Sequence, residues 1–238
     1  MTRKRSTDIE VIDPERYLLS SGFMRDFLKE TLGPDEKITE GDLPRIRLPG
    51  LGGTTWEQPN GNPVKVLEGI IIHRQVVRAW WGAVYTGESN PPDCSSPSGP
   101  NCIGHWHYEG QACATCPMSQ QGSGNAETMS QACRVITRLY MLFPASVLPT
   151  MLRLPPSSFK FCKQYVLNDL PALGFPAYHR VETSIGLRQE KNAGGILYSV
   201  ATFEPLRVVG PEALEALEAY RQAILPLLKA LPVTAAED

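Results

Sequence analysis

The distribution of cysteines constrains this chain of 238 residues more than any other feature of its sequence. Five of the six cysteines fall between Cys94 and Cys133, in a stretch rich in glycine, proline and serine. Within it, Cys113 and Cys116 form a CxxC knuckle, the tight turn through which two thiolates can reach one tetrahedral metal ion. Because the stretch has little apolar material from which to build a core, we expect a cross-link to hold it together.

A zinc site is the interpretation that this spacing favours over a disulfide set, a redox CxxC or free thiols. A structural zinc site is closed by four nitrogen or sulfur ligands. We predict as the ligands of Zn²⁺ the residues Cys94, Cys113, Cys116 and Cys133. Three further donors in the same stretch, Cys102, His105 and His107, could each replace one of the four.

Composition bounds the class of protein. A hydrophobic content of 42% is enough for a real core, and the length allows one large or two small domains. No apolar run follows Met1–Arg5, so we expect no secretory signal and a reducing compartment, in which disulfides are disfavoured. No stretch is long and apolar enough to span a bilayer, so we expect no membrane among the partners.

Apolar periodicity predicts a mostly β fold with peripheral helices. Strands are expected within 64–81, 135–154 and 178–209, the last being a hairpin that turns at Lys191–Gly195. Gly69 interrupts the first of these regions, and strands that bend through a glycine are typical of small barrels. We therefore expect an OB-like β-barrel, with the cysteine loop inserted between its first and second strand regions.

Helices and a short strand complete the expected elements. Cap residues and apolar spacing predict helices over 13–32, from Ser157 or Ser158 to about Leu170, and from Gly210 onward with a kink at Pro226. Arg45–Leu48 alternates like a short strand. The expected segments are a helical extension at 1–40, the barrel at 41–210 with its zinc loop at 91–134, and a C-terminal helix at 211–238.

Aromatic and basic residues interleave around the cysteine loop and along the predicted strands. Proteins that bind single-stranded nucleic acid use this combination, because bases stack on rings while phosphates follow cations. As candidate contacts we select Trp80, Trp81, Tyr85, Trp106, Tyr108, Arg74, Arg78, Arg134, Arg138, Lys160, Lys163 and Arg188. The alternative is that the rings are buried in the core and the cations are ordinary solvated side chains.

Catalytic motifs are missing from the sequence. We find no GxSxG, no Walker glycine loop, no GxGxxG after a predicted strand and no HExxH. The run 107–109 fits the HxE half of the zinc deaminase signature, but it ends four residues before Cys113, and no proline precedes the knuckle. The acidic residues of 61–200 are scattered singly, which disfavours a nuclease. We therefore expect a protein that is not an enzyme.

Several segments resemble a group of phage- and mobile-element-encoded proteins associated with single-stranded DNA binding. They are Pro92–Ser96, Cys113–Pro117, Gly122–Ser123, Ala132–Arg134 and Leu154–Lys160, and a looser resemblance extends over Gly69–Phe203. The resemblance implies an OB-like fold with an inserted zinc loop whose ligands are four cysteines. It also implies non-catalytic binding of single-stranded DNA in replication, recombination or defence, in the cytoplasm of a bacterial or phage-infected cell.

The chain departs from this pattern at two places. Pro97-Ser98-Gly99 stands where such proteins often have an aspartate and a glycine. Only Glu237-Asp238 stands where replicative single-strand binders tend to carry a long acidic tail that recruits partners.

A zinc-stapled protein-interaction adaptor is the second function that these features allow. Its aromatic surface would meet a partner protein within a larger complex. Salt separates the two functions, since phosphate contacts weaken steeply as salt rises and an apolar interface barely responds. Sequence alone leaves open the choice of DNA or RNA, any sequence preference and the oligomeric state.

Overall fold

The structure is a computed structural model, which describes residues 10–12, 16–17, 26, 30, 38–82, 91–97, 100–103, 110–127, 129–175 and 177–233. Cα proximity divides the chain into two compact units. The first comprises residues 1–74 and 139–226, and the second residues 75–138 and 227–238. These units interleave along the chain, whereas the three segments expected from the sequence follow one another.

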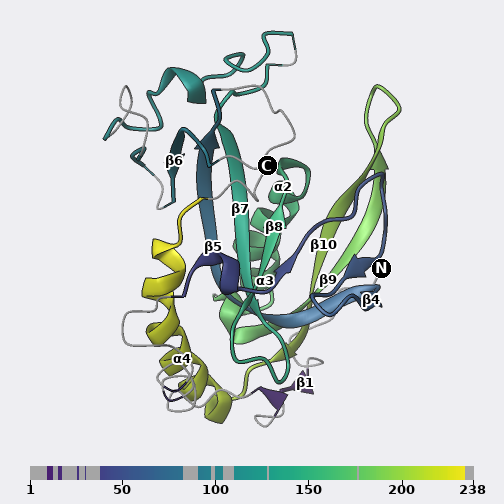
Figure 1. Cartoon of the computed structure of the whole chain (residues 1–238). Helices are drawn as coiled ribbons and strands as arrows, with labels where there is room; N and C mark the ends of the chain where they lie inside the picture. The colour runs from purple at the N-terminus through teal and green to yellow at the C-terminus, as the bar shows by residue number, and fades with distance from the viewer. Residues whose placement is uncertain are drawn as a thin grey trace. The chain divides into compact units, whose positions relative to one another are not determined.

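A mixed, strand-rich sheet is the main element of the fold (Figure 1). Its strands are β1 (Glu10–Val11), β2 (Arg45–Ile46), β5 (Val66–Trp80), β6 (Cys94–Ser96), β7 (Arg134–Leu142), β8 (Thr150–Leu154), β9 (Val181–Lys191) and β10 (Leu197–Val208). They are ordered β1-β10-β9-β5-β7-β8-β2, with β6 pairing separately to β5. Strands β3 (Trp56–Glu57) and β4 (Pro63–Val64) form a small antiparallel sheet of their own.

The prediction of a closed barrel is wrong for the described residues, over which the sheet stays open. Its path begins at β1 and ends at β2, and these two strands do not pair with each other there. Each is two residues long and is held by parallel pairing, β1 to β10 and β2 to β8. A closed barrel needs continuous pairing around its whole circumference, and edges this short provide too few hydrogen bonds for it.

Gly69 serves a different purpose from the predicted bend. A Cβ at this position would lie 2.7 Å from the carbonyl oxygen of Leu142 and 3.1 Å from the ring of Phe143. Glycine therefore permits the close approach of neighbouring backbone at the end of β7, which is a common reason for glycine within a strand.

The predicted β regions are confirmed. Strand β5 lies within 64–81, β7 and β8 lie within 135–154 apart from the first residue of β7, and β9 and β10 form the long hairpin within 178–209 (Figure 1). The hairpin turns one residue later than predicted. Asn192 closes it, because its backbone amide donates to the carbonyl of Ile196 (3.0 Å) and its Oδ1 accepts from the Ile196 amide (2.8 Å).

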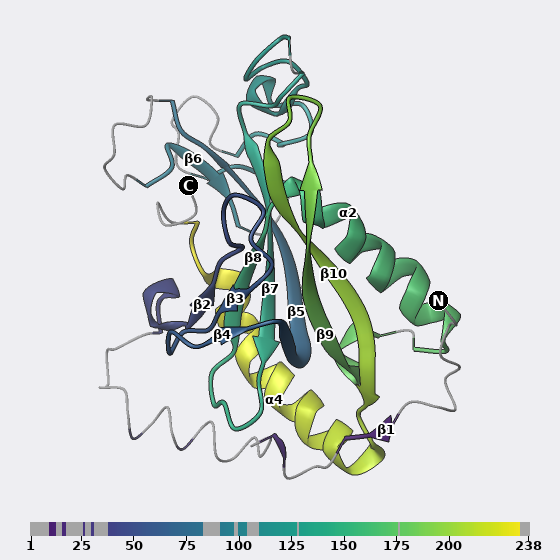
Figure 2. The same ribbon diagram turned by 90° about the vertical axis from the view of Figure 1, so that its right-hand side faces the viewer.

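Helices follow the predicted positions where the structure describes them. A continuous helical run consists of α2 (Pro156–Gln164), a π turn (Tyr165–Asp169) and α3 (Leu170–Ala172), and α4 spans Pro211–Ala230 with Pro226 inside it. Figure 2 shows α2 alongside β10, where the Ser158 hydroxyl accepts a hydrogen bond from the Ala201 amide at 3.0 Å. Most of the predicted helix 13–32 lies outside the described residues. None of the described helices has the length and apolarity that crossing a membrane requires.

Trp56 is the largest of the fully buried side chains and belongs to the core of the first unit. Its indole Nε1 donates to the carbonyl of Ile185 at 2.9 Å. We expect Trp56→Ala to lower the free energy of unfolding by about 3–5 kcal/mol, because a large cavity replaces the ring. Urea unfolding measures this, with exposed Ile196→Ala as the control that should change stability by less than about 0.5 kcal/mol. Equal effects of the two variants would contradict the core position of Trp56.

Candidate metal centre

Strand β6 brings the first cysteine of the stretch to β5. Antiparallel pairing sets Cys94 opposite Trp80 and Ser96 opposite Arg78. Alternate residues of a strand point to the same face, so these four side chains share one side of the β5–β6 pair. This pairing builds one wall of a candidate site in the second unit.

Cys102 reaches the same site through a return of the chain. Ser95 and Ile103 exchange two backbone hydrogen bonds of 2.9 and 2.7 Å, which align the segment around Cys102 with β6. The amide of Cys113 then donates to the carbonyl of Pro100 at 2.6 Å. Backbone hydrogen bonds thus connect β6, the segment around Cys102 and the start of the CxxC knuckle.

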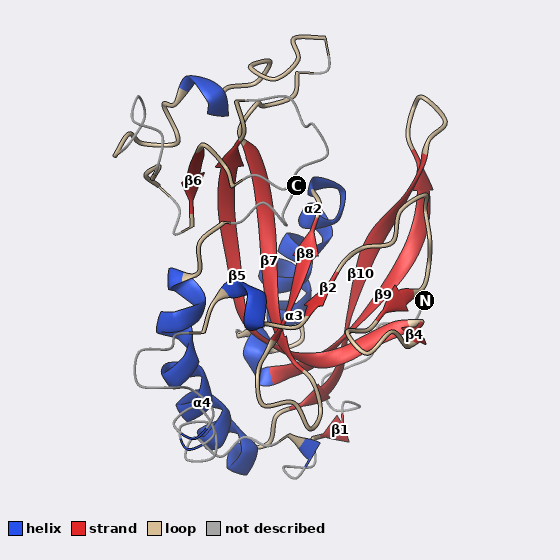
Figure 3. Cartoon of the chain, viewed as in Figure 1, coloured by secondary structure: helices blue, strands red, loops and turns tan. Residues whose placement is uncertain are grey.

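A short 3-10 turn, η4 (Pro117–Ser119), follows the knuckle directly, in a region that is otherwise mostly loop (Figure 3). The Gln120 side chain donates to the carbonyl of Cys116 at 3.1 Å. The amide of Cys133 donates to the carbonyl of Met118 at 2.8 Å, which brings the last cysteine of the stretch beside the knuckle.

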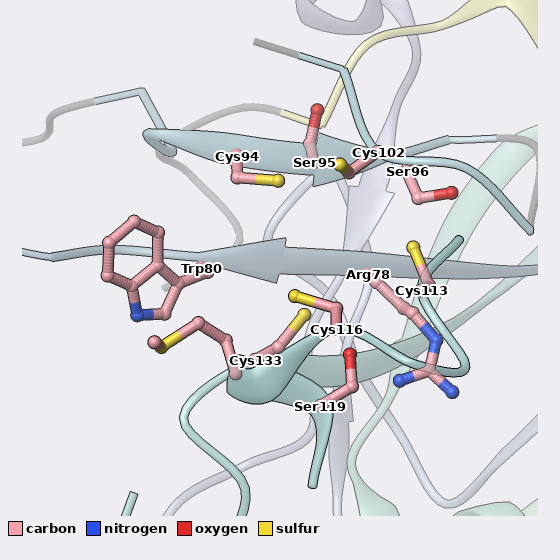
Figure 4. Close-up of a pocket in the computed structure, with 11 residues that line it drawn as sticks. Arg78, Trp80, Cys94, Ser95, Ser96, Cys102, Cys113, Cys116, Ser119 and Cys133 are labelled. Carbon is pink, nitrogen blue, oxygen red and sulfur yellow. The ribbon is translucent and has the colours of Figure 1, made fainter. Parts of the chain in front are cut away.

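Five cysteines line one small cavity, which we call the cysteine cavity (Figure 4). They are Cys94, Cys102, Cys113, Cys116 and Cys133, and each is 7% exposed or less. The cavity measures about 10 Å³, which is roughly the space of one water-sized group. That volume admits a single ion and excludes an organic ligand. All four predicted zinc ligands are therefore gathered around a space of suitable size, together with a fifth thiol.

The sulfurs are not yet arranged as a finished coordination sphere. In the part of the chain that the structure describes, no three His, Cys, Asp or Glu side chains form a group that could hold a metal ion as they stand. His105 and His107 lie outside the described residues. Zinc at the cysteine cavity therefore remains a prediction, supported by the gathering of the thiols.

Burial governs the electrostatics of the thiols. It is the main cause that raises the pKa of Cys94 to about 12, with the neighbouring thiol of Cys102 next. Burial also raises the pKa of Cys133, while the Ser119 hydroxyl and the Arg78 guanidinium oppose the rise. Thiols of raised pKa are protonated at neutral pH, so a metal ion must displace protons when it binds.

Two unpaired polar atoms fit a metal–thiolate centre at this cavity. Ser119 Oγ and Arg78 Nη1 are buried, belong to residues that line the cavity, and have no hydrogen-bond partner among the described residues. An unpaired buried donor is costly, and thiolates around a metal would supply acceptors. The remaining cysteine, Cys162, is fully buried in the core of the first unit, and burial raises the pKa of its thiol to about 11.

Cys102→Ser tests which of the five cysteines bind the metal. With Cys94, Cys113, Cys116 and Cys133 as the ligands, the Cys102→Ser variant should retain the zinc content of the wild type, whereas Cys94→Ser should lose the metal. Elemental analysis of the two purified variants measures this directly. Loss of zinc from Cys102→Ser with retention in Cys94→Ser would exchange the roles of the two residues.

Three of the candidate nucleic-acid residues of the second unit have no described position, and three others contact the cysteine cavity or a neighbouring ring. Tyr85, Trp106 and Tyr108 lie outside the described residues. Trp80 and Arg78 line the cysteine cavity. The guanidinium of Arg134 lies 5.4 Å from the ring centroid of Trp81, at the edge of a small apolar cluster.

The position of Arg138 does not fit the predicted set of nucleic-acid contacts. It is fully buried and donates to the carbonyls of Leu231 at 3.3 Å and Pro232 at 2.8 Å. Its guanidinium therefore satisfies backbone acceptors of the C-terminal segment, within the second unit. A cation in this position does not reach a phosphate.

Cations and rings gather on the first unit around helix α2. Arg74 lies 5.1 Å from the ring centroid of Phe159, while Lys160 and Arg188 lie 4.7 and 4.4 Å from that of Phe161. We name this group the α2 surface and define it as Arg74, Phe159, Lys160, Phe161, Lys163 and Arg188. Lys160, Lys163 and Arg188 are exposed, and both phenylalanines are half-buried.

The two phenylalanines of the α2 surface were missed by the sequence analysis. They flank Lys160 in the run Phe159-Lys160-Phe161, and a phenylalanine on either side of a lysine is the only signal for them in the sequence, because their exposure depends on how α2 packs. Their contacts with Arg74 and Arg188 join residues far apart in the chain, and spacing alone does not reveal them.

Comparison of the chain with protein-family models, with curated proteins and with solved structures finds no match in any of the three.

Proposed function

We propose that this protein binds single-stranded DNA without catalysing a reaction, in the replication, recombination or defence of a phage or mobile element. In the same proposal, a zinc ion held by Cys94, Cys113, Cys116 and Cys133 stabilises the cysteine loop. The observation that carries the DNA-binding part is the α2 surface, where exposed cations lie against aromatic rings.

Binding of single-stranded DNA uses both aromatic rings and cationic side chains. Stacking of a base on an aromatic ring is worth roughly 1–3 kcal/mol, and cations along the path attract the phosphates. Lys160 and Lys163 are exposed on α2, whereas Arg188 also donates to the carboxylate of Glu190, which partly neutralises it. The two lysines are therefore the strongest candidates for phosphate contacts.

Zinc contributes to this function as a structural ion. It would be held by thiolates of the four cysteines and would supply cross-links between β6, the knuckle and the start of β7. The loop residues Trp106 and Tyr108 fall between these anchor points in the sequence. Of the OB-like relationship that the sequence resemblance implies, the proposal keeps only a strand-rich fold, since the sheet is open over the described residues.

Fluorescence titration with a labelled single-stranded oligonucleotide and its duplex, at low and at high salt, tests the proposal. We expect tighter binding of the single strand, with an affinity that falls as salt rises because phosphate contacts release counterions. Absence of binding at low salt would remove the nucleic-acid function.

Exposed apolar side chains favour the protein-interaction adaptor as the second candidate. Leu51 is 90% exposed and Ile196, at the turn of the β9–β10 hairpin, is 64% exposed. Scattered exposed apolar residues are common on surfaces, so this observation is weaker than the α2 surface. Binding of a partner protein that barely changes between low and high salt would support the adaptor.

A further inference from the structure

We infer that Arg78 and Ser119 are positioning residues of the metal centre, which compensate the charge of the thiolates and hold their orientation. This inference rests on the proposed zinc site. Arg78 was selected from the sequence as a nucleic-acid contact. In this inference it instead supports the ligands of the cysteine cavity.

Charge balance favours this role for Arg78. Four thiolates and one Zn²⁺ ion carry a net charge of −2, and a buried charge is stable only when it is paired and hydrogen-bonded. Arg78 supplies the one cation among the described residues that line the cavity. The five cysteines that line the cavity are buried, so a charge on their sulfurs would be only weakly solvated.

The position of Arg78 is set by strand pairing. Its backbone lies opposite Ser96, two residues along β5 from Trp80, which lies opposite Cys94. The side chains of Arg78 and Cys94 therefore leave the same face of the β5–β6 pair. Figure 4 shows the guanidinium of Arg78 at the rim of the cysteine group, near Cys113 and Ser119. Its buried Nη1 has no hydrogen-bond partner among the described residues, and sulfur acceptors at the cavity would satisfy it.

Ser119 reaches the cavity from the side of the knuckle. It ends the η4 turn, where its amide donates to the carbonyl of Cys116 at 2.9 Å and thereby places the side chain beside the knuckle. The residue is 8% exposed, and its hydroxyl, too, finds no partner within the described residues. Both donors therefore belong to residues that line the cysteine cavity.

Partners of this kind matter for metal retention. Groups that hydrogen-bond to metal ligands orient them, and their loss typically lowers metal affinity by about 10–100-fold. We expect Arg78→Met and Ser119→Ala each to lose zinc about tenfold more readily to a competing chelator than the wild type does. Arg78→Lys keeps the charge and should retain zinc better than Arg78→Met, although it lacks the second nitrogen of the fork.

The experiment measures zinc transfer from the full chain to a colorimetric chelator, together with the sulfur-to-metal charge-transfer bands of the cobalt-substituted protein. Arg134→Met is the matched control, because Arg134 is an exposed cation of the same unit that lies over Trp81 and does not line the cavity. It should retain zinc as the wild type does. Ser119→Ala removes a single oxygen, so it tests the inference even when Arg78→Met does not fold.

Three results overturn the inference, and they are distinguishable. A wild-type chain that binds neither zinc nor cobalt removes the proposed metal site itself. Wild-type retention of zinc by both Arg78→Met and Ser119→Ala leaves the metal site in place and removes the positioning roles. Loss of single-stranded DNA affinity by Arg78→Met with unchanged zinc retention makes Arg78 a DNA contact instead.

Discussion

Replacement of Cys113 by serine should abolish stoichiometric zinc binding, whereas the wild type should carry about one zinc ion per chain. The serine hydroxyl is a poor substitute for a thiolate. The variant also keeps only one thiolate of the CxxC knuckle, and Cys102, which lies on a different segment, does not reproduce that tight turn. Structural zinc contributes apparent binding free energies of about 10–16 kcal/mol to small folded elements. Its loss should therefore loosen the cysteine loop, lower the solubility of the variant and weaken DNA binding.

Elemental analysis and limited proteolysis measure the two parts of this prediction. Cleavage of the Cys113→Ser variant should concentrate within the cysteine stretch, and chelation of the wild-type protein should reproduce the same pattern. Cys102→Ser is the matched control, because it removes a thiol from the same cavity without removing a predicted ligand. A Cys113→Ser variant that is fully folded and binds DNA normally would refute the zinc clamp.

Reversal of charge on the α2 surface should reduce the affinity for single-stranded DNA by roughly 100-fold at low salt. The double variant Lys160→Glu/Lys163→Glu places two carboxylates where we expect phosphates, while both lysines are exposed and lie outside the core. Each lost phosphate contact should also lower the slope of log affinity against log salt by about 0.7 for a single strand. The same fluorescence titration, repeated over a series of salt concentrations, gives both values.

A control must separate the effect of the net charge of the protein from the effect of the position of the two lysines. Lys65→Glu/Arg180→Glu changes the charge of the chain by the same amount at two other exposed cations of the first unit. This control should reduce affinity far less than the α2 variant does. Equal losses would show that the strand responds to the overall charge of the protein, and the α2 surface would then not be the binding site.

The candidate site was predicted in part. The spacing of the cysteines identified the four residues that gather at the cysteine cavity, because a CxxC knuckle and its flanking thiols carry their chemistry in the sequence itself. Cys102 was left as a spare donor, and the bridge between Ser95 and Ile103 brings it to the same cavity. Ser119 was not selected at all, since a serine in a polar loop has no distinguishing signal until its burial is known.

Local sequence patterns were enough to predict the main strands of this protein. Alternation and apolar runs predicted β5, β7, β8 and the β9–β10 hairpin, because the periodicity of a strand depends only on residues close in sequence. Tertiary structure alone decided whether the sheet closed. The short edge strands β1 and β2 pair with β10 and β8, partners far along the chain, and local periodicity does not determine such pairings.

Long-range contacts also decided the roles of individual side chains. In the sequence, Arg138 resembles any other basic residue of a strand. In the fold it is buried and donates to carbonyls of residues more than ninety positions further along the chain. Arg188 likewise meets Phe161 only because α2 contacts β10, the hairpin partner of β9. Sequence determines which chemical groups are present and which elements they occupy. The fold determines which groups become neighbours, because burial and contact depend on residues that are distant along the chain.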